Sequence, residues 1–182
     1  MIFKWSRSIL VGEQFMMEPL EAFYTGKVVY IPLADRLMEL RERGFGDLRD
    51  DRLTLSPFEA FYLVEKTRIR VFDEKRRVEI SLRELFKDLS VGKSEIWVKY
   101  LVYRDLRDRG YIVREASKMD FEVYGRDAAR RFISIIYEGR EATITNLEKS
   151  FSVASKQKME LVLAVVDRRT DIVYYSLGKQ EF

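Results

Sequence analysis

The stretch Leu161-Val162-Leu163-Ala164-Val165-Val166 is an unbroken apolar run that ends at Asp167. A run of this length, rich in β-branched residues and closed by a polar turn, favours a strand over a helix, which would be longer. Because every position is apolar, both faces of the strand should be covered, as in a sheet that carries helices. We therefore expect residues 161–166 to form a central strand of a helix-covered sheet.

The segments on either side of this run predict the rest of the same sheet. A helix is expected over 143–154, and a longer one is expected from the capping residue Ser94 to Arg109, stopped by Gly110. Residues 172–177 form an apolar strand with a short tail behind it, so we expect an edge strand there. The other strands expected in this half are 111–114, 121–124 and 132–137.

The front half of the chain carries the two clearest helix starts. Ser56 is followed by Pro57 and Glu59, and Ser81 is followed by Glu84, so each serine can begin a capping box. We expect helices from these serines to about Lys66 and Leu89. The remaining elements expected here are strands at 7–11, 27–31, 69–72 and 77–80, a helical turn at 18–24 and a helix at 34–43.

The segment Val91-Gly92-Lys93 is the only polar break near the middle that is followed by a new long element. We place a domain boundary there, with a small α+β domain over 1–92 and a second domain over 93–182. The second domain reads helix, three strands, helix and two strands, which indicates a mixed sheet with helices packed on it. The predicted fold class is α+β.

The composition excludes many kinds of catalytic site. The 182 residues include no cysteine and no histidine, and 33 Lys and Arg against 30 Asp and Glu leave a net charge of +3. Zinc fingers, thiolate nucleophiles, Ser–His–Asp triads and imidazole bases are therefore excluded. Carboxylate, tyrosine, lysine or arginine chemistry remains, or none, and we expect no cofactor and no metal.

Other features of the sequence bear on where the protein is located, on heat adaptation and on metal binding. No apolar run approaches the ~18–20 residues of a membrane span, and the N-terminus is too short in apolar residues for a secretory signal, so we expect a soluble cytoplasmic protein. A charged fraction of 35% without cysteine is typical of heat-adapted proteins, and the alternative is a mesophilic protein that is merely rich in charge. The acidic pairs Asp50-Asp51 and Asp73-Glu74 lack a third ligand at metal-site spacing and are interpreted as turn residues.

Four stretches, in this order, resemble the archaeal tRNA-splicing endonucleases. LSPFEAFYLVEK at 55–66 is similar to a helix of that family's N-terminal domain, and KYLVYRDLRDRGY at 99–111 to the helix and turn that open its nuclease domain. DFEVY at 120–124 resembles the strand that delivers the catalytic tyrosine. LVLAVVD at 161–167 with IVYY at 172–175 resembles the closing pair of strands. The resemblance extends from about residue 50 onward.

The resemblance implies a nuclease-like C-terminal domain, related to restriction endonucleases, and a metal-independent reaction. Members of the family cut precursor tRNA at bulge-helix-bulge junctions, leaving a 2′,3′-cyclic phosphate and a 5′-hydroxyl. A tyrosine takes the proton of the attacking 2′-hydroxyl, a histidine protonates the leaving 5′-oxygen, and a lysine stabilises the charged phosphorane.

This chain retains one of the three catalytic residues that the resemblance implies. The tyrosine corresponds to Tyr124. The histidine position falls at Ala129, and the lysine position falls at Met159, with Lys156 and Lys158 close by. The resemblance thus implies a non-catalytic, structural subunit that supports a catalytic partner chain. A degenerate but active nuclease using Tyr124 with a nearby lysine, and a stand-alone RNA-binding module, are the alternatives; Tyr124 itself could be a packing residue.

Further residues acquire expected roles from the same resemblance. Arg126, Arg130 and Arg131 surround the loop that lacks the histidine and could contact RNA phosphates or stack on a splayed base, or simply be solvated. The loop from Asp167 to Asp171 matches an acidic loop that joins two dimers, but two arginines dilute its charge. It could be that plug or an ordinary turn, or this chain could supply the groove that receives a partner's loop.

The final strand completes the expected interface. Its residues would pair across a dimer, and the whole enzyme would be a heterotetramer of two plus two chains that acts on precursor tRNA, with no membrane involved. The interface residues expected on this basis are Asp167, Asp171, Ile172, Val173, Tyr174, Tyr175 and Leu177.

Overall fold

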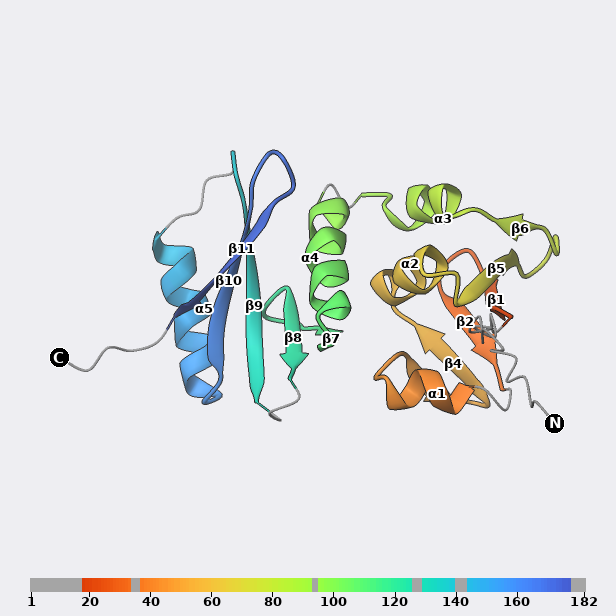
Figure 1. Ribbon diagram of the computed structural model, residues 1–182, viewed down its shortest axis with the longest axis horizontal. Helices are drawn as coiled ribbons and strands as arrows, with labels where there is room; N and C mark the ends of the chain where they lie inside the picture. Colours follow the sequence, from red (N-terminus) through yellow and green to blue (C-terminus); the bar gives the residue numbers. More distant parts are fainter. Residues whose placement is uncertain (1–17, 34–36, 93–94, 126–128, 140–143, 178–182) are drawn as a thin grey trace, which may run out of the picture.

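The computed structural model of the chain describes residues 18–33, 37–92, 95–125, 129–139 and 144–177 (Figure 1). They form two mixed β-sheets, one from each half of the chain, with helix α4 (Ile96–Asp108) standing between them. The predicted α+β class is confirmed. No helix in these described ranges is both long and apolar enough to cross a membrane.

The first sheet has six strands in the order β3-β4-β2-β1-β5-β6, and only the pair β1 and β5 is parallel. Its strands are β1 (Leu20–Tyr24), β2 (Val29–Pro32), β3 (Asp47–Arg49), β4 (Arg52–Leu55), β5 (Ile69–Asp73) and β6 (Glu79–Ile80). The predicted hairpin of residues 69–72 and 77–80 is confirmed as β5 and β6. The strand expected at 7–11 lies outside the described residues.

The prediction of a helical turn at 18–24 is wrong, because this segment is strand β1 in the interior of the first sheet. Ala22 and Tyr24 alternate with more exposed neighbours and lie in the core, and the strand pairs with β5 through five residue pairs. Pairing with a strand about fifty residues away decides the conformation, and a short segment carries no local sign of that.

The hairpin of β3 and β4 was not predicted from the sequence, although its turn residues were. Asp50 and Asp51 both have positive φ, 46° and 56°, in the two-residue connection between the strands. Aspartate tolerates this left-handed region better than most residues, so the acidic pair suits the turn. The interpretation of Asp50-Asp51 as turn residues is confirmed.

Three helices belong to the same half as the first sheet, with α2 packed on β4 and β5 and α3 packed on α2, and the capping signals place two of them. In α2 (Pro57–Glu65) the Ser56 hydroxyl accepts from the backbone N–H of Glu59, and in α3 (Leu82–Leu89) Ser81 and Glu84 make the same box. The third helix, α1 (Leu37–Glu42), is followed by Gly44 at φ 76°. A Cβ there would lie 2.6 Å from the Ile112 side chain, so glycine is required for conformation and for space.

The second sheet has five strands in the order β11-β10-β9-β8-β7, with β9 and β10 parallel and the other pairs antiparallel. Its elements are β7 (Ile112–Glu115), β8 (Phe121–Tyr124), β9 (Arg130–Tyr137), α5 (Ile144–Lys156), β10 (Glu160–Val166) and β11 (Ile172–Leu177). The apolar run 161–166 is an interior strand as expected, but the middle position belongs to β9. The expected edge strand at 172–177 is confirmed as β11.

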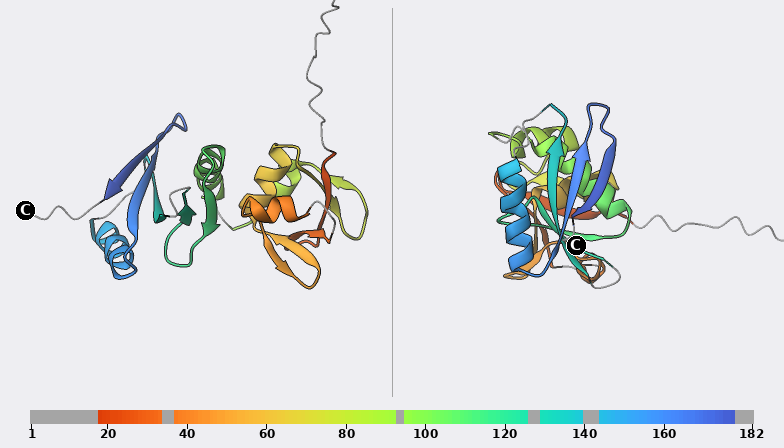
Figure 2. Two further views of the ribbon diagram at one scale, coloured as in Figure 1. Left: turned by 60° about the horizontal axis from the view of Figure 1, so that its bottom comes forward. Right: turned by 90° about the vertical axis from the view of Figure 1, so that its left-hand side faces the viewer.

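The two faces of this sheet are covered by different helices (Figures 1 and 2). On one face Phe132, Leu161 and Leu163 form a cluster with Ala154 of α5. On the other face the core of the molecule includes Ile133, Ala164 and Val166. On the α5 face of β11, Leu177 packs on the α5 cluster, but Val173 and Tyr175 are half exposed.

Helix α4 joins the two sheets into one core. Phe58 of α2 stacks on Tyr103 of α4 at a centroid distance of 5.8 Å, and its ring edge meets Phe121 of β8 at 5.3 Å. The guanidinium of Arg107, 8% exposed, lies 3.7 Å from the centre of the Phe45 ring and donates to the Arg43 carbonyl at 2.9 Å. Ser94, the expected cap of this helix, lies outside the described residues, and Glu95 at the cap position makes no side-chain capping hydrogen bond.

Candidate functional site

The register of the second sheet brings the three expected catalytic positions to one end. Tyr124, at the end of β8, pairs with Arg130 at the start of β9, and Arg131 pairs with Glu160 at the start of β10. Met159 directly precedes β10, and Ala129 directly precedes β9. The tyrosine position and both substituted positions therefore lie at the same edge of the sheet, as the resemblance implies.

Tyr124 lies beside the ion pair of Glu122 and Arg130, on the face of the sheet that α5 covers in part. The Arg130 guanidinium lies 5.5 Å from the centre of the phenol ring. Burial raises the pKa of Tyr124 above its usual value of 10.0, and the neighbouring Glu122 carboxylate raises it further by accepting the hydroxyl hydrogen. The phenol is therefore protonated at neutral pH and is a poor proton acceptor.

Ala129 stands where the resemblance implies a histidine. The backbone N–H of Gly125 donates to the Ala129 carbonyl at 3.2 Å, which closes the loop between β8 and β9. Arg126, predicted as an RNA ligand, lies outside the described residues. A methyl side chain can neither donate nor accept a proton, so this position supplies no general acid.

Met159, at the position of the implied lysine, belongs to the helix end that precedes β10. Lys158 takes a left-handed conformation, φ 54°, and the Met159 N–H donates back to the Ala154 carbonyl at 3.0 Å. The Met159 side chain packs on the apolar cluster of Phe132 and Leu161. Lys156 and Lys158 are both exposed. The position itself is apolar and helps to close the helix onto the sheet.

Arg130 and Arg131 point to opposite faces of the sheet because successive strand residues alternate. Arg130 is paired with Glu122, with 2.7 Å between Nε and Oε1, on the Tyr124 face. Arg131 is paired with Glu160 at 2.7 Å and lines a cavity of about 270 Å³ on the α4 side, together with Arg109. The two arginines therefore cannot bind one ligand on one face of the strand.

In the comparison with known proteins, each half of the chain matches the model of a protein-family domain. Residues 96–174 match the model of the tRNA intron endonuclease catalytic C-terminal domain, and residues 21–86 match the model of the tRNA intron endonuclease N-terminal domain. The tRNA-splicing endonuclease of Pyrococcus abyssi is 38% identical over 168 residues, which cover 89% of this chain and 97% of that protein. The chain belongs to the tRNA intron endonuclease family.

Other relatives in the family agree with this assignment. The tRNA-splicing endonuclease of Pyrococcus furiosus is 36% identical over 175 residues, covering 92% of this chain and all of that protein. The one from Methanococcus vannielii is 34% identical over 151 residues, covering 79% of this chain and 85% of that protein. These relatives are archaeal proteins, as the resemblance implied.

In this tRNA intron endonuclease chain, the carboxylate of Asp167 stabilises the turn between β10 and β11. The Asp167 carboxylate accepts from the backbone N–H groups of Arg169 at 2.7 Å and Asp171 at 2.9 Å. Arg168 lies near Glu138, with 3.9 Å between the charged atoms. The turn joins the ends of β10 and β11 that lie away from Tyr124. The hydrogen bonds of its carboxylate show that Asp167 stabilises the turn.

The predicted interface residues of β11 divide between the two faces of the sheet. Tyr174 points toward α4 and donates its hydroxyl hydrogen to Asp105 at 2.7 Å; burial and this bond hold its pKa above the usual range. Ile172 packs on the same core, and Leu177 packs on the α5 cluster. Val173 and Tyr175, at 50% and 54% exposure, are the large apolar side chains of this strand that remain open.

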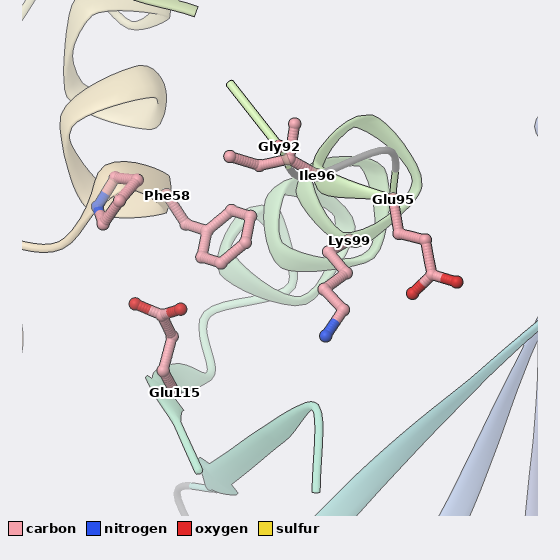
Figure 3. Close-up of a pocket in the computed structure, with 7 residues that line it drawn as sticks. Phe58, Gly92, Glu95, Ile96, Lys99 and Glu115 are labelled. Atoms are coloured by element: carbon pink, nitrogen blue, oxygen red, sulfur yellow. The ribbon is translucent and has the colours of Figure 1, made fainter. Parts of the chain in front are cut away.

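A cavity of about 400 Å³ between the starts of α2 and α4 was not anticipated from the sequence (Figure 3). Lys99 of α4 and Glu115 at the end of β7 extend into it beside Phe58. Lys99 also pairs with Asp120 at 2.6 Å, at the opposite end of β8 from Tyr124. Four residues of strand separate the two places by about 13 Å, so Lys99 does not belong to the Tyr124 site. Within the described ranges, no group of three or more acidic residues is placed to hold a metal ion.

Proposed function

We propose that this chain is the structural subunit of a tRNA-splicing endonuclease and positions precursor tRNA for a catalytic partner chain. The observation that carries the proposal is the absence of histidine, with Ala129 at the position of the general acid. Loss of a general acid costs about 10²–10⁴ in rate. Met159 at the lysine position and the raised pKa of the Tyr124 phenol support the same assignment.

The proposed enzyme is a heterotetramer of two structural and two catalytic chains. The exposed side chains of Val173 and Tyr175 on an edge strand supply apolar surface for pairing with another chain. We also propose that the chain divides into domains at 1–92 and 93–182; in support, one family model ends at residue 86 and the next begins at residue 96. Arg126, Arg130 and Arg131 are proposed RNA contacts. For Arg130 and Arg131 this requires RNA phosphate to compete with Glu122 and Glu160 for the guanidinium groups.

A cleavage assay tests this function directly. A bulge-helix-bulge RNA is incubated with the purified chain, with a catalytic family chain that is inactive by itself, and with the mixture. We expect no cutting by this chain alone and cutting by the mixture into a 2′,3′-cyclic phosphate and a 5′-hydroxyl. A mixture in which the catalytic chain has lost its histidine is the control and should stay inactive.

The two alternative functions give different results in the same experiment. Cutting by this chain alone that is lost in Tyr124→Phe would establish a degenerate but active nuclease. A monomer by native mass spectrometry that binds RNA, yet neither joins nor activates a catalytic chain, would establish a stand-alone RNA-binding module. Either result overturns the structural-subunit proposal.

A further inference from the structure

An apolar groove between α3 and α4 lies on a different face of α4 from the cavity of Figure 3. Its volume is about 510 Å³, within the range of small-molecule sites. Leu82 and Phe86 of α3 and Tyr100 of α4 form its apolar lining. Trp97 also lines it and is 49% exposed, although it is the largest aromatic side chain of α4. The groove thus presents an aromatic surface to solvent.

The Trp97 indole is held in place by the aromatic residues behind it. It meets Phe86 at a centroid distance of 5.6 Å and Tyr100 at 6.1 Å, and Phe86 in turn packs on Phe61 at 4.6 Å. A ring supported in this way can receive a flat ligand with little loss of side-chain entropy. The half-exposed indole is therefore preorganised for stacking.

The charges at the rim of the groove are mainly positive. Arg83 and Lys87, one helical turn apart on α3, line the groove, are exposed, and form no ion pair within the described part of the chain. The one acid in the lining, Glu65, accepts the Tyr100 hydroxyl hydrogen and pairs with Arg104 at 3.3 Å.

The other acids of α3 are not among the residues that line the groove. Glu84 closes the capping box with Ser81, and Asp88 lies on the side of α3 toward Tyr24, where burial and the Asp88 charge raise the pKa of the phenol. From α3, the charged residues that line the groove are therefore the two cations Arg83 and Lys87. Two cations beside an exposed aromatic ring match a flat group that carries phosphate.

We propose that this groove binds an unpaired nucleotide of RNA, with the base stacked on Trp97 and the phosphates near Arg83 and Lys87. Bases in duplex RNA are already stacked, so the ligand is a nucleotide from a loop, a bulge or a single-stranded end. The choice of RNA rests on membership of the tRNA intron endonuclease family, but it does not depend on whether this chain is structural or catalytic. The site lies at the junction of the two sheets, on helices away from the Tyr124 edge.

The test measures binding of a fluorescein-labelled oligouridine to the full chain by fluorescence anisotropy. This probe has no bulge-helix-bulge junction, so the result is independent of the cleavage assay. Trp97→Ala should weaken binding by about fivefold or more, the loss expected for one base stacked on an aromatic ring. Trp97→Phe should retain most of the affinity, whereas Trp97→Leu, apolar without an aromatic face, should behave like the alanine variant.

The cations are tested by charge reversal with a matched control. Arg83→Glu with Lys87→Glu should weaken binding and reduce the slope of log affinity against log salt by about 0.7 for each phosphate contact removed. Lys75→Glu with Arg76→Glu changes the net charge equally in the exposed β5–β6 turn, far from α4 in Figure 1, and should leave most of the affinity. Circular dichroism checks that each variant is folded.

Three results would overturn the proposal. The first is equal oligouridine affinity for the folded Trp97→Ala and Trp97→Leu variants and the unmodified chain. The second is an equal loss of affinity in both charge-reversal variants. The third is unchanged RNA affinity together with loss of binding to a catalytic family chain, which would make the groove a protein interface.

Discussion

Tyr124 shows how neighbours decide what one side chain can do. The Tyr124 phenol is held in its neutral form, since burial disfavours the phenolate and the Glu122 carboxylate accepts the hydroxyl hydrogen. The nearby Arg130 favours the phenolate, but its charge is shared with the same Glu122. Without a histidine in the chain, nothing in this arrangement completes proton transfer to a leaving oxygen.

We predict that Tyr124→Phe in this chain leaves the cleavage rate of the two-chain enzyme within about twofold, because the phenol is not at a complete site. The same substitution at the catalytic tyrosine of the partner chain should lower the rate by about 10²-fold or more. Single-turnover cleavage of a bulge-helix-bulge RNA measures both. A large loss from the Tyr124 variant alone would place this residue in the chemistry and contradict the structural role.

At the scale of elements, the helix starts were predictable because their signal is local. The capping boxes at Ser56 and Ser81 use residues three apart, and both form as expected. Strand β1 was not predictable in this way, because its pairing with β5 joins segments distant in the chain. Strand alternation alone predicts that Arg130 and Arg131, as neighbours in one strand, point to opposite faces of the sheet. It likewise predicts that Glu122 and Tyr124, two residues apart, share one face.

The two capping boxes make a matched pair for a stability experiment. Ser56→Ala should lower the free energy of unfolding by about 1–2 kcal/mol, and Ser81→Ala by about 0.5–1 kcal/mol. The difference is expected because Glu59, the partner of Ser56, is buried and also accepts from the Gly46 N–H at 2.9 Å, whereas the box at Ser81 is exposed. Urea denaturation of both variants measures the two losses in free energy of unfolding. A larger loss for Ser81→Ala than for Ser56→Ala would contradict this explanation.

Strand β11 carries the prediction about assembly. Val173→Lys and Tyr175→Lys should each shift the two-chain complex toward smaller species in native mass spectrometry, because a charge replaces exposed apolar surface on an edge strand. Val91→Lys changes a side chain that is 80% exposed in the connection between α3 and α4 and not on β11, so it serves as the control. If the lysine variants assembled as well as the control, β11 would not be the interface.

At the scale of the whole molecule, the two sheets share one hydrophobic core across α2 and α4. The contacts of Phe58 with Tyr103 and Phe121 cross this junction, as do the hydrogen bonds of Tyr62 to Asp108 and of Arg107 to the Arg43 carbonyl. The sequence indicated each helix but not this junction, because apolar periodicity identifies a buried face without identifying what covers it. A single cooperative unfolding transition is expected from a core shared in this way.

This junction also makes the molecule sensitive to alkaline pH. Burial and the hydrogen bond to Asp108 raise the pKa of Tyr62 from 10.0 to about 12. Between these values the unfolded chain releases the proton while the folded chain retains it, so stability is complete below pH 10 and falls as pH rises toward 12. The loss from this residue should be on the order of 2 kcal/mol at the upper end of the window.

We therefore predict that the free energy of unfolding, measured by urea denaturation at several pH values, decreases from about pH 10 upward. Tyr62→Phe should make this decrease shallower, since phenylalanine has no proton to lose, while some slope remains from Tyr100 and Tyr103, whose pKa values burial also raises. Tyr175→Phe, at a half-exposed site on β11, is the matched control and should retain the full slope. Equal slopes for the Tyr62 and Tyr175 variants would mean that the junction does not hold Tyr62 in its neutral form.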